Sequence, residues 1–129
     1  MIETRGRVLI VEDEIEVAAT MLELLVARSY EVLTATTAEE ALKIVPAFRP
    51  NVLLLDITLP GMSGPGLLTT FRRAHPRLPV IVVTAAVDPG VLARIAERDP
   101  FHVVYKPFDI DALDRLISLA VSKTGSAAT

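Results

Sequence analysis

The sequence predicts an α/β domain built as a doubly wound, five-stranded parallel sheet with helices on both faces. Short apolar runs recur along the chain, and each is bounded by charged or turn-forming residues, which is typical of strands buried on both faces. Segments with helical spacing of apolar residues alternate strictly with these runs. Such alternation predicts right-handed βαβ units that form one parallel sheet.

The strands follow from runs of β-branched residues and leucine. The first run, VLIV, stops at three acidic residues, and the central run, VLLL, stops at Asp56. Pro60, Gly61 and Gly64 break regular structure shortly after that acid. The five expected strands cover residues 8–11, 30–33, 52–55, 80–83 and 101–105.

Five helices are expected to alternate with these strands. Asp13 is expected to cap the first helix, and residues 36–40 (TTAEE) offer the second helix a capping box in either of two registers. Asp88 and Pro89 supply a cap and a first-turn proline for the fourth helix. The polar residues 122–129 are expected to fray. The apolar faces of the five helices fall within residues 15–25, 38–45, 66–74, 91–95 and 110–120.

Composition and charge exclude several classes of protein. With 129 residues and 51% hydrophobic content, the chain is long and apolar enough for one domain with a real core. A net charge of -3 without a basic stripe argues against nucleic-acid binding, and the absence of cysteine excludes disulfides and thiolate metal sites. No apolar run approaches the ~18 residues of a membrane span, so a cytoplasmic protein that binds no membrane is expected. The expected domain is residues 1–122, with 123–129 as a flexible polar tail or the start of a linker.

Polar side chains follow four of the five expected strands. Glu12 and Asp13 follow the first strand, Asp56 the third, Thr84 the fourth and Lys106 the fifth. Because the carboxyl ends of parallel strands lie on one edge of the sheet, these side chains can share one cleft. Each alone could be an ordinary polar residue at a strand end, but their joint occurrence at matching positions argues against that.

Three carboxylates in this cleft would repel one another, which raises the pKa of one of them or requires a cation. A hard divalent ion with oxygen ligands resolves the repulsion. Mg²⁺ fits best, because it accepts one or two carboxylates together with water and phosphate oxygens. The residues therefore predict an Mg²⁺ site at this edge of the sheet.

The chain resembles the receiver domains of two-component response regulators, the CheY-like superfamily, from Arg7 to Val121. Four motifs carry the resemblance, in order and at the family's spacing: VLIVEDE, LLLDITLPGMSG, VVTA and KPF. The resemblance implies a flavodoxin-like fold with five helices and the strand order 2-1-3-4-5. It also implies a signalling phosphoacceptor that assists its own phosphorylation and dephosphorylation, and not an enzyme with a separate substrate.

By this resemblance, Asp56 is the phosphoacceptor. Its carboxylate would attack the phosphorus of a phosphohistidine on a partner histidine kinase or phosphotransfer protein, and protein groups would mainly supply positioning and charge. Asp13 and Asp56 would bind Mg²⁺ directly and Glu12 directly or through water. The backbone carbonyl of Thr58 would be the further protein ligand.

Two other residues would contact the phosphoryl group by the same resemblance. Lys106 would pair with Asp56 or with a phosphoryl oxygen. Thr84 would donate its hydroxyl to another phosphoryl oxygen, and its movement would report the added charge of about -1.5 to -2. The Lys106–Pro107 peptide bond is expected to be cis.

The chain departs from the family's pattern at the switch position. An aromatic residue usually lies three residues before the lysine, and here that position is Val103. Phe101 and Tyr105 flank Val103 at a spacing of two, which predicts that they share its strand face. Either of them is then a candidate to substitute for the aromatic residue. The alternative is a relay without an aromatic rotor.

The partners are expected to be the phosphoryl donor and an output protein that the sequence does not identify. Family practice points to the fourth helix, fifth strand and fifth helix for this contact, which would also form the interface if the domain is a dimer and not a monomer. A receiver-like module that signals by binding alone, without phosphorylation, remains the alternative. A dehalogenase-type phosphohydrolase would need a second Asp where Thr58 stands, and Glu12, Asp13 and Glu14 would repel a flavin phosphate.

Overall fold

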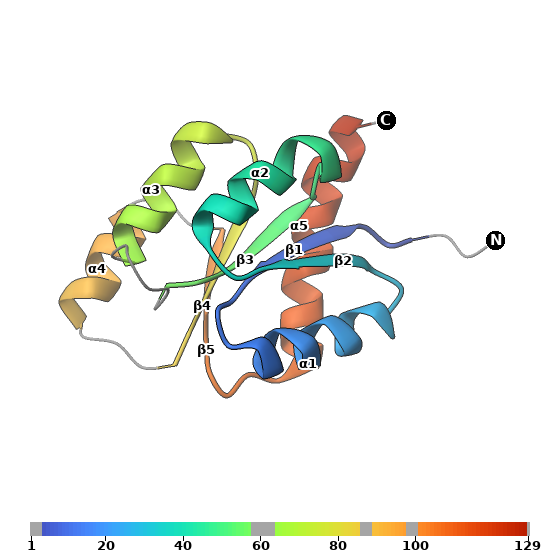
Figure 1. Cartoon of the computed structure of the whole chain (residues 1–129), viewed down its shortest axis with the longest axis horizontal. Helices are drawn as coiled ribbons and strands as arrows, with labels where there is room; N and C mark the ends of the chain where they lie inside the picture. The colour runs from blue at the N-terminus through green and yellow to red at the C-terminus, as the bar shows by residue number, and fades with distance from the viewer. Residues whose placement is uncertain (1–3, 58–63, 86–88, 98–100, 129) are drawn as a thin grey trace.

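The computed structural model describes residues 4–57, 64–85, 89–97 and 101–128 of the chain. Strands and helices alternate strictly along it (Figure 1). The strands are β1 (Arg7–Val11), β2 (Glu31–Ala35), β3 (Val52–Asp56), β4 (Val80–Thr84) and β5 (His102–Tyr105). The helices are α1 (Ile15–Val26), α2 (Ala38–Phe48), α3 (Gly64–Ala74), α4 (Pro89–Glu97) and α5 (Ile110–Ala128).

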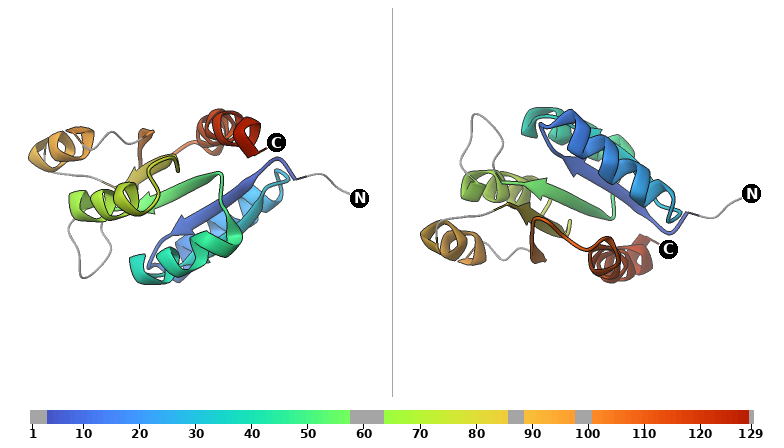
Figure 2. Two further views of the ribbon diagram at one scale, coloured as in Figure 1. Left: turned by 90° about the horizontal axis from the view of Figure 1, so that it is seen from above. Right: turned by 90° about the horizontal axis from the view of Figure 1, so that it is seen from below.

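The five strands form one parallel sheet in the order β2-β1-β3-β4-β5. The predicted fold class and the strand order implied by the resemblance are therefore confirmed. The order reverses between β1 and β3, which places a topological switch point at their carboxyl ends, where open α/β sheets bind ligands. Figure 2 shows the twisted sheet with helices on both of its sides.

Alternate residues of the central strands build two separate cores. On one face, Leu9, Leu53 and Val82 pack with residues of α2, α3 and α4. On the other face, Ile10 and Leu54 pack with residues of α1 and α5. Because every residue of β3 and β4 is buried, both faces require apolar side chains, and this explains the continuous runs in the sequence.

The predicted N-terminal cap is wrong for α1, and one of the two predicted registers is observed for α2. The N-cap of α1 is Glu14, without a side-chain capping bond, so the predicted cap at Asp13 is wrong. The Glu14 amide instead donates to the Glu12 carboxylate at 3.3 Å. At α2 the later of the two capping registers is the observed one, because the Glu40 amide donates to the Thr37 hydroxyl.

The end of α5 continues further than the sequence predicts. Residues 122–128, which were expected to fray, continue the helix to Ala128. Two hydroxyls support this part of the helix. Ser122 donates to the Ser118 carbonyl, and the Thr124 hydroxyl lies within hydrogen-bond distance of the side-chain Nδ2 and the backbone carbonyl of Asn51. Neither α5 nor any other helix in the described residues is long and apolar enough to cross a membrane.

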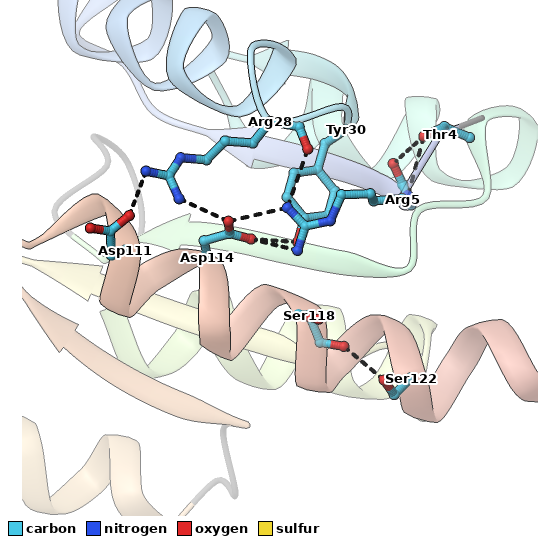
Figure 3. Close-up of polar contacts among 9 residues, drawn as sticks. Thr4, Arg5, Arg28, Tyr30, Asp111, Asp114, Ser118 and Ser122 are labelled. Carbon is cyan, nitrogen blue, oxygen red and sulfur yellow. Dashed lines mark hydrogen bonds and ion pairs between the residues drawn. The ribbon is translucent and has the colours of Figure 1, made fainter. Parts of the chain in front are cut away.

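A polar cluster fastens the chain before β1 to the helices on one face (Figure 3). Its centre is Asp114 of α5, a buried carboxylate that accepts a hydrogen bond from the Tyr30 hydroxyl at 2.7 Å. Arg5 and Arg28 form ion pairs with the same carboxylate at 3.0 and 2.9 Å. The Arg5 guanidinium also lies 4.5 Å above the centre of the Tyr30 ring. We call these four residues the Asp114 cluster.

Candidate functional site

The sheet brings the predicted polar residues together at its carboxyl edge. Asp56 is the last residue of β3 and Thr84 the last residue of β4, while Glu12 and Lys106 directly follow β1 and β5. The backbone ladder fixes the last two, since the Glu12 amide donates to the Ala35 carbonyl at 2.9 Å and the Lys106 amide to the Thr84 carbonyl at 2.6 Å. Positions far apart in the sequence thus become neighbours through parallel strand pairing.

Three carboxylates gather at this edge. Glu12, Asp13 and Asp56 each offer an oxygen, and these oxygens all lie within 4.8 Å of one another. Glu12 and Asp56 are buried, whereas Asp13 is exposed. A cluster of carboxylate oxygens with one side open to solvent fits Mg²⁺, which prefers oxygen ligands and retains several waters.

Lys106 supplies the positive charge beside this cluster. Its Nζ lies 2.9 Å from Glu12 Oε1 and 3.8 Å from Asp56 Oδ2. The closer partner is thus Glu12, and the sequence-based expectation named only Asp56 and a phosphoryl oxygen. Burial lowers the pKa of Lys106, but the hydrogen bond to Glu12 and the charge of Asp56 outweigh burial and raise it, so the ammonium remains charged.

Glu12 has the perturbed carboxyl group of the site. Burial, and after it the hydrogen bond shared with Asp56, raise the pKa of Glu12 to about 7 despite the opposing effect of Lys106. The predicted consequence of crowding carboxylates is therefore present at this residue. One ammonium does not compensate the three acids, so a further cation is favoured.

The hydroxyl of Thr84 stands out among the polar groups of the described residues. Thr84 is fully buried, and its Oγ1 has no hydrogen-bond partner within that part of the chain. A buried hydroxyl without a partner costs free energy, on the order of 1 to 3 kcal/mol. Such a group at a strand end beside the acid cluster is available to a ligand oxygen.

A comparison with known protein families agrees with this geometry. The family model for the response regulator receiver domain matches residues 8–118. The chain belongs to this family. It is thus a receiver domain of two-component signal transduction, as the four motifs predict.

Individual relatives give the same result for this receiver domain. It is 34% identical over 118 residues to the DNA-binding transcriptional regulator NtrC of Escherichia coli, which covers 92% of this chain and 25% of that protein. A CheY-like receiver domain from Methanospirillum hungatei superposes with a TM-score of 0.82 at 26% identity, covering 93% of this chain and 97% of that one. The receiver domain of a modulated diguanylate cyclase from Desulfovibrio desulfuricans gives a TM-score of 0.82 at 33% identity, covering 95% and 98%. The chain spans about a quarter of the length of its NtrC relatives.

The residues expected at the switch of the receiver domain lie on different faces. Val103 packs against the core beside α2, α3 and α4, whereas Phe101 packs against the opposite core with Val104. The prediction that Phe101 shares the face of Val103 is wrong, because β5 begins at His102 and strand alternation does not extend to Phe101. Tyr105 is 53% exposed at the end of β5.

Two other expectations about the site have different outcomes. The Lys106–Pro107 bond is cis, as the resemblance implies. Thr58, named as a backbone ligand, lies outside the described residues. The ion pair of Lys106 with Glu12 was not among the contacts expected from the sequence. The signal for it was that both residues follow strands that end at the same edge of the sheet.

Proposed function

We propose that this receiver domain accepts a phosphoryl group on Asp56 from the phosphohistidine of a histidine kinase or phosphotransfer protein. The observation that carries the proposal is the set of groups around Asp56 at the end of β3. Two more carboxylates lie within 4.8 Å, an ammonium lies at 3.8 Å, and the nearby Thr84 hydroxyl has no partner among the described residues. Membership of the receiver family supports the same role.

The reaction would be a single displacement at phosphorus. A carboxylate oxygen of Asp56 forms the new O–P bond, and the P–N bond of the phosphohistidine breaks with its electron pair returning to the imidazole. The product is an acyl phosphate on Asp56. The protein's task in such a transfer is to position the groups and to neutralise charge.

Glu12, Asp13 and Asp56 would hold Mg²⁺, together with the backbone carbonyl of Thr58. When bound, the ion would supply positive charge against the phosphoryl oxygens. The carboxylates must be ionised to bind the ion. Because the pKa of Glu12 is about 7, the ionised fraction of this residue changes with pH near neutrality.

Lys106 and Thr84 would bind the phosphoryl group from the other side. Lys106 is a point cation on a long stem, and it can leave Glu12 for a phosphoryl oxygen once the negative charge on Asp56 increases. The Thr84 hydroxyl would gain a hydrogen-bond acceptor and thereby respond to phosphorylation.

The proposal can be tested with a small acyl-phosphate donor and Mg²⁺, followed by intact mass spectrometry. We expect one added phosphoryl group on the wild-type chain and none on Asp56→Asn. Glu23→Gln, which changes an exposed carboxylate on α1, serves as the matched control and should label like the wild type. Labelling that persists on Asp56→Asn would contradict the role of Asp56. A wild-type chain that takes no label would favour the module that signals by binding alone.

We propose that the signal leaves the site without the usual aromatic rotor, because Val103 occupies the switch position. Val103→Tyr should alter partner binding only in the phosphorylated state, whereas Phe101→Ala, on the opposite core, should change stability more than signalling. Binding of the output partner with and without phosphorylation measures the difference. A loss of phosphorylation-dependent binding in Phe101→Ala, with its fold intact, would instead make Phe101 the relay.

The output surface is proposed to comprise α4, β5 and α5, and the same surface would serve dimerisation. Tyr105 of β5 and Leu119 of α5 are 53% and 57% exposed and supply apolar area to this surface, although α1 also exposes Ile15 and Val26. In NtrC the matched part is about a quarter of a DNA-binding transcriptional regulator. We propose that here too the receiver controls a separate output activity, and does not itself bind nucleic acid.

A further inference from the structure

A pocket of about 690 Å³ opens at the amino edge of the sheet, opposite the carboxyl-edge site. It is lined where β3 and β4 begin and where α2, α3 and α5 end, and Figure 1 shows these three helix ends at the same edge. From Asn51 to Asp56 the chain rises roughly 15 Å along β3, so the pocket is remote from the acid cluster. Its volume is within the range of known ligand pockets, roughly 300 to 1,000 Å³.

The walls of this amino-edge pocket are largely apolar and conformationally restricted. Val45 and Leu78 contribute aliphatic surface, and four of the lining residues are prolines. Asn51 connects the strands and α5 at the base of the pocket. Its Oδ1 accepts a hydrogen bond from the Arg7 backbone amide at 2.8 Å, and its Nδ2 donates to the Thr124 hydroxyl at 3.1 Å. A restricted wall lowers the entropic cost of ordering the pocket when a ligand binds.

The charge of the pocket is opposite to the charge of the whole chain. Arg7, Arg49, Arg77 and Lys123 all line it, and no acidic residue does so among the described residues. Three of these cations are exposed, and the chain as a whole carries a net charge of -3. An acidic segment would therefore be attracted to this edge and repelled by the carboxyl edge.

Part of this positive charge has a structural role. Arg49 caps α2 in a left-handed conformation, with φ of 53°, and its carbonyl accepts a hydrogen bond from Arg7 Nε. Cations at helix carboxyl ends stabilise the helix dipole without any ligand. Lys123 also has a contact within the fold, since its Nζ lies 5.3 Å from the centre of the Phe101 ring. Neither role accounts for the apolar walls or for the absence of acidic lining residues in the described part of the chain.

We propose that this pocket docks an acidic peptide segment of a partner protein, with one apolar side chain inserted between the prolines. The cations would pair with the carboxylates of the segment while the walls cover its apolar side chain. Complementary charge would steer the encounter, and burial of the apolar side chain would slow dissociation. Docking here leaves the carboxyl edge accessible to a phosphoryl donor.

The test uses the full chain without phosphoryl donor or Mg²⁺, so its outcome is independent of the proposed function. The probe is a short dye-labelled peptide of alternating Glu and Leu, followed by fluorescence anisotropy and by amide chemical shifts. We expect saturable binding that weakens with added salt and shifts the Asn51 and Leu78 amides. Arg49→Glu/Arg77→Glu should weaken binding about tenfold or more. Lys43→Glu/Arg115→Glu, an equal charge change at exposed positions outside the pocket, should have little effect.

A second variant keeps the test valid if the charge reversal impairs folding. Ala74→Trp fills the pocket from the exposed end of α3 without changing charge, and it should abolish binding of the Glu–Leu peptide. Equal affinity for an all-Glu peptide would overturn the proposal, because the apolar walls would then contribute nothing. Equal losses in the pocket pair and the control pair would overturn it as well, since binding would reflect net charge alone.

Discussion

The receiver domain buries carboxylates in two places, and the charge of the neighbouring groups differs between them. Asp114 accepts hydrogen bonds from two guanidinium groups and a phenol, all drawn in Figure 3. Glu12 and Asp56 lie beside each other with Asp13, and Lys106 is the ammonium that pairs with them. The first carboxylate is compensated by its neighbours, and the second group is crowded by like charge.

The pKa values express this difference. Burial alone would raise the pKa of Asp114, but the hydrogen bonds from Arg5, Tyr30 and Arg28 outweigh burial and lower it to about 2. Burial also raises the pKa of Glu12, and the shared hydrogen bond with Asp56 adds to this effect and brings it to about 7. Burial disfavours the ionised form of both acids, so the neighbouring groups decide which form of each acid is stabilised.

Asp114 is thus a structural carboxylate, whereas the acids at the carboxyl edge are the ones proposed to bind Mg²⁺ and to accept a phosphoryl group. A compensated charge such as Asp114 contributes to stability and leaves little for a ligand to improve. Under the proposed function, the carboxyl-edge acids would gain most from an external cation, because one ammonium does not compensate their charge. Substitutions that change one charge in each region should consequently act in opposite directions on the free energy of unfolding.

The largest effect is expected for Asp114→Asn. The neutral amide leaves the Arg5 and Arg28 guanidinium groups without their shared carboxylate, and loss of one partner from a buried ionic cluster is strongly destabilising. Because Arg5 and Arg28 are 41% and 31% exposed, water partly replaces their lost contact, and we expect a loss of about 2 kcal/mol in the free energy of unfolding. Urea denaturation at neutral pH measures it.

The matched control for this substitution is Asp111→Asn. Asp111 pairs with the same Arg28, but its side chain is 62% exposed, so water replaces the lost contact. The control should unfold close to the wild type. If both variants lose equal stability, burial of Asp114 does not matter and the comparison between the two regions is wrong.

The next effect is the dependence of this stability difference on acidic pH. The pKa of Asp114 in the folded chain lies below its usual value of 3.8, so its contribution is fully present above about pH 4 and is lost as pH falls toward 2. A shift from 3.8 to about 2 corresponds to about 2 kcal/mol. The difference in free energy of unfolding between the wild type and Asp114→Asn should therefore shrink by this amount across that window. Urea titrations at several acidic pH values test it, and a constant difference would contradict the assignment to Asp114.

Most of the fold could be predicted because the central strands are buried on both faces. Their core positions require apolar side chains on both faces, and the short length of VLLL and VIVV, together with the turn-forming residues around them, indicates strands. The ends of elements were less predictable, since they depend on individual contacts. At the start of α1, the Glu12 carboxylate accepts a hydrogen bond from the Glu14 backbone amide, and Asp13 does not cap the helix. At the end of α5, the Thr124 hydroxyl accepts a hydrogen bond from the Asn51 side chain, which supports the additional helical turn.

The acid cluster could be predicted and the Asp114 cluster could not, for a physical reason. The ends of parallel strands must meet at one edge, so topology alone brings Glu12, Asp56 and Lys106 together. Arg5, Tyr30 and Asp114 meet through the length of their side chains and the packing of α5, which no local pattern specifies. One signal was present, because a buried tyrosine hydroxyl usually requires a polar partner.

The smallest effect, opposite in sign to that of Asp114→Asn, is expected for Asp56→Asn without Mg²⁺. The substitution removes one negative charge beside Glu12, while Lys106 retains its closer ion pair with Glu12 at 2.9 Å. Relief of like-charge repulsion at this separation should stabilise the fold by about 1 kcal/mol at pH 8, where Glu12 is largely ionised.

Added Mg²⁺ should reduce or reverse this difference in stability between Asp56→Asn and the wild type. Mg²⁺ should raise the free energy of unfolding of the wild type more than that of Asp56→Asn, because the variant has lost one of its proposed ligands. Urea denaturation with and without Mg²⁺ gives all four values, and Glu23→Gln provides the control for removing an exposed carboxylate. A variant less stable than the wild type in the absence of Mg²⁺ would mean that Asp56 is compensated like Asp114. In that case the carboxyl edge would hold no excess negative charge to attract a cation.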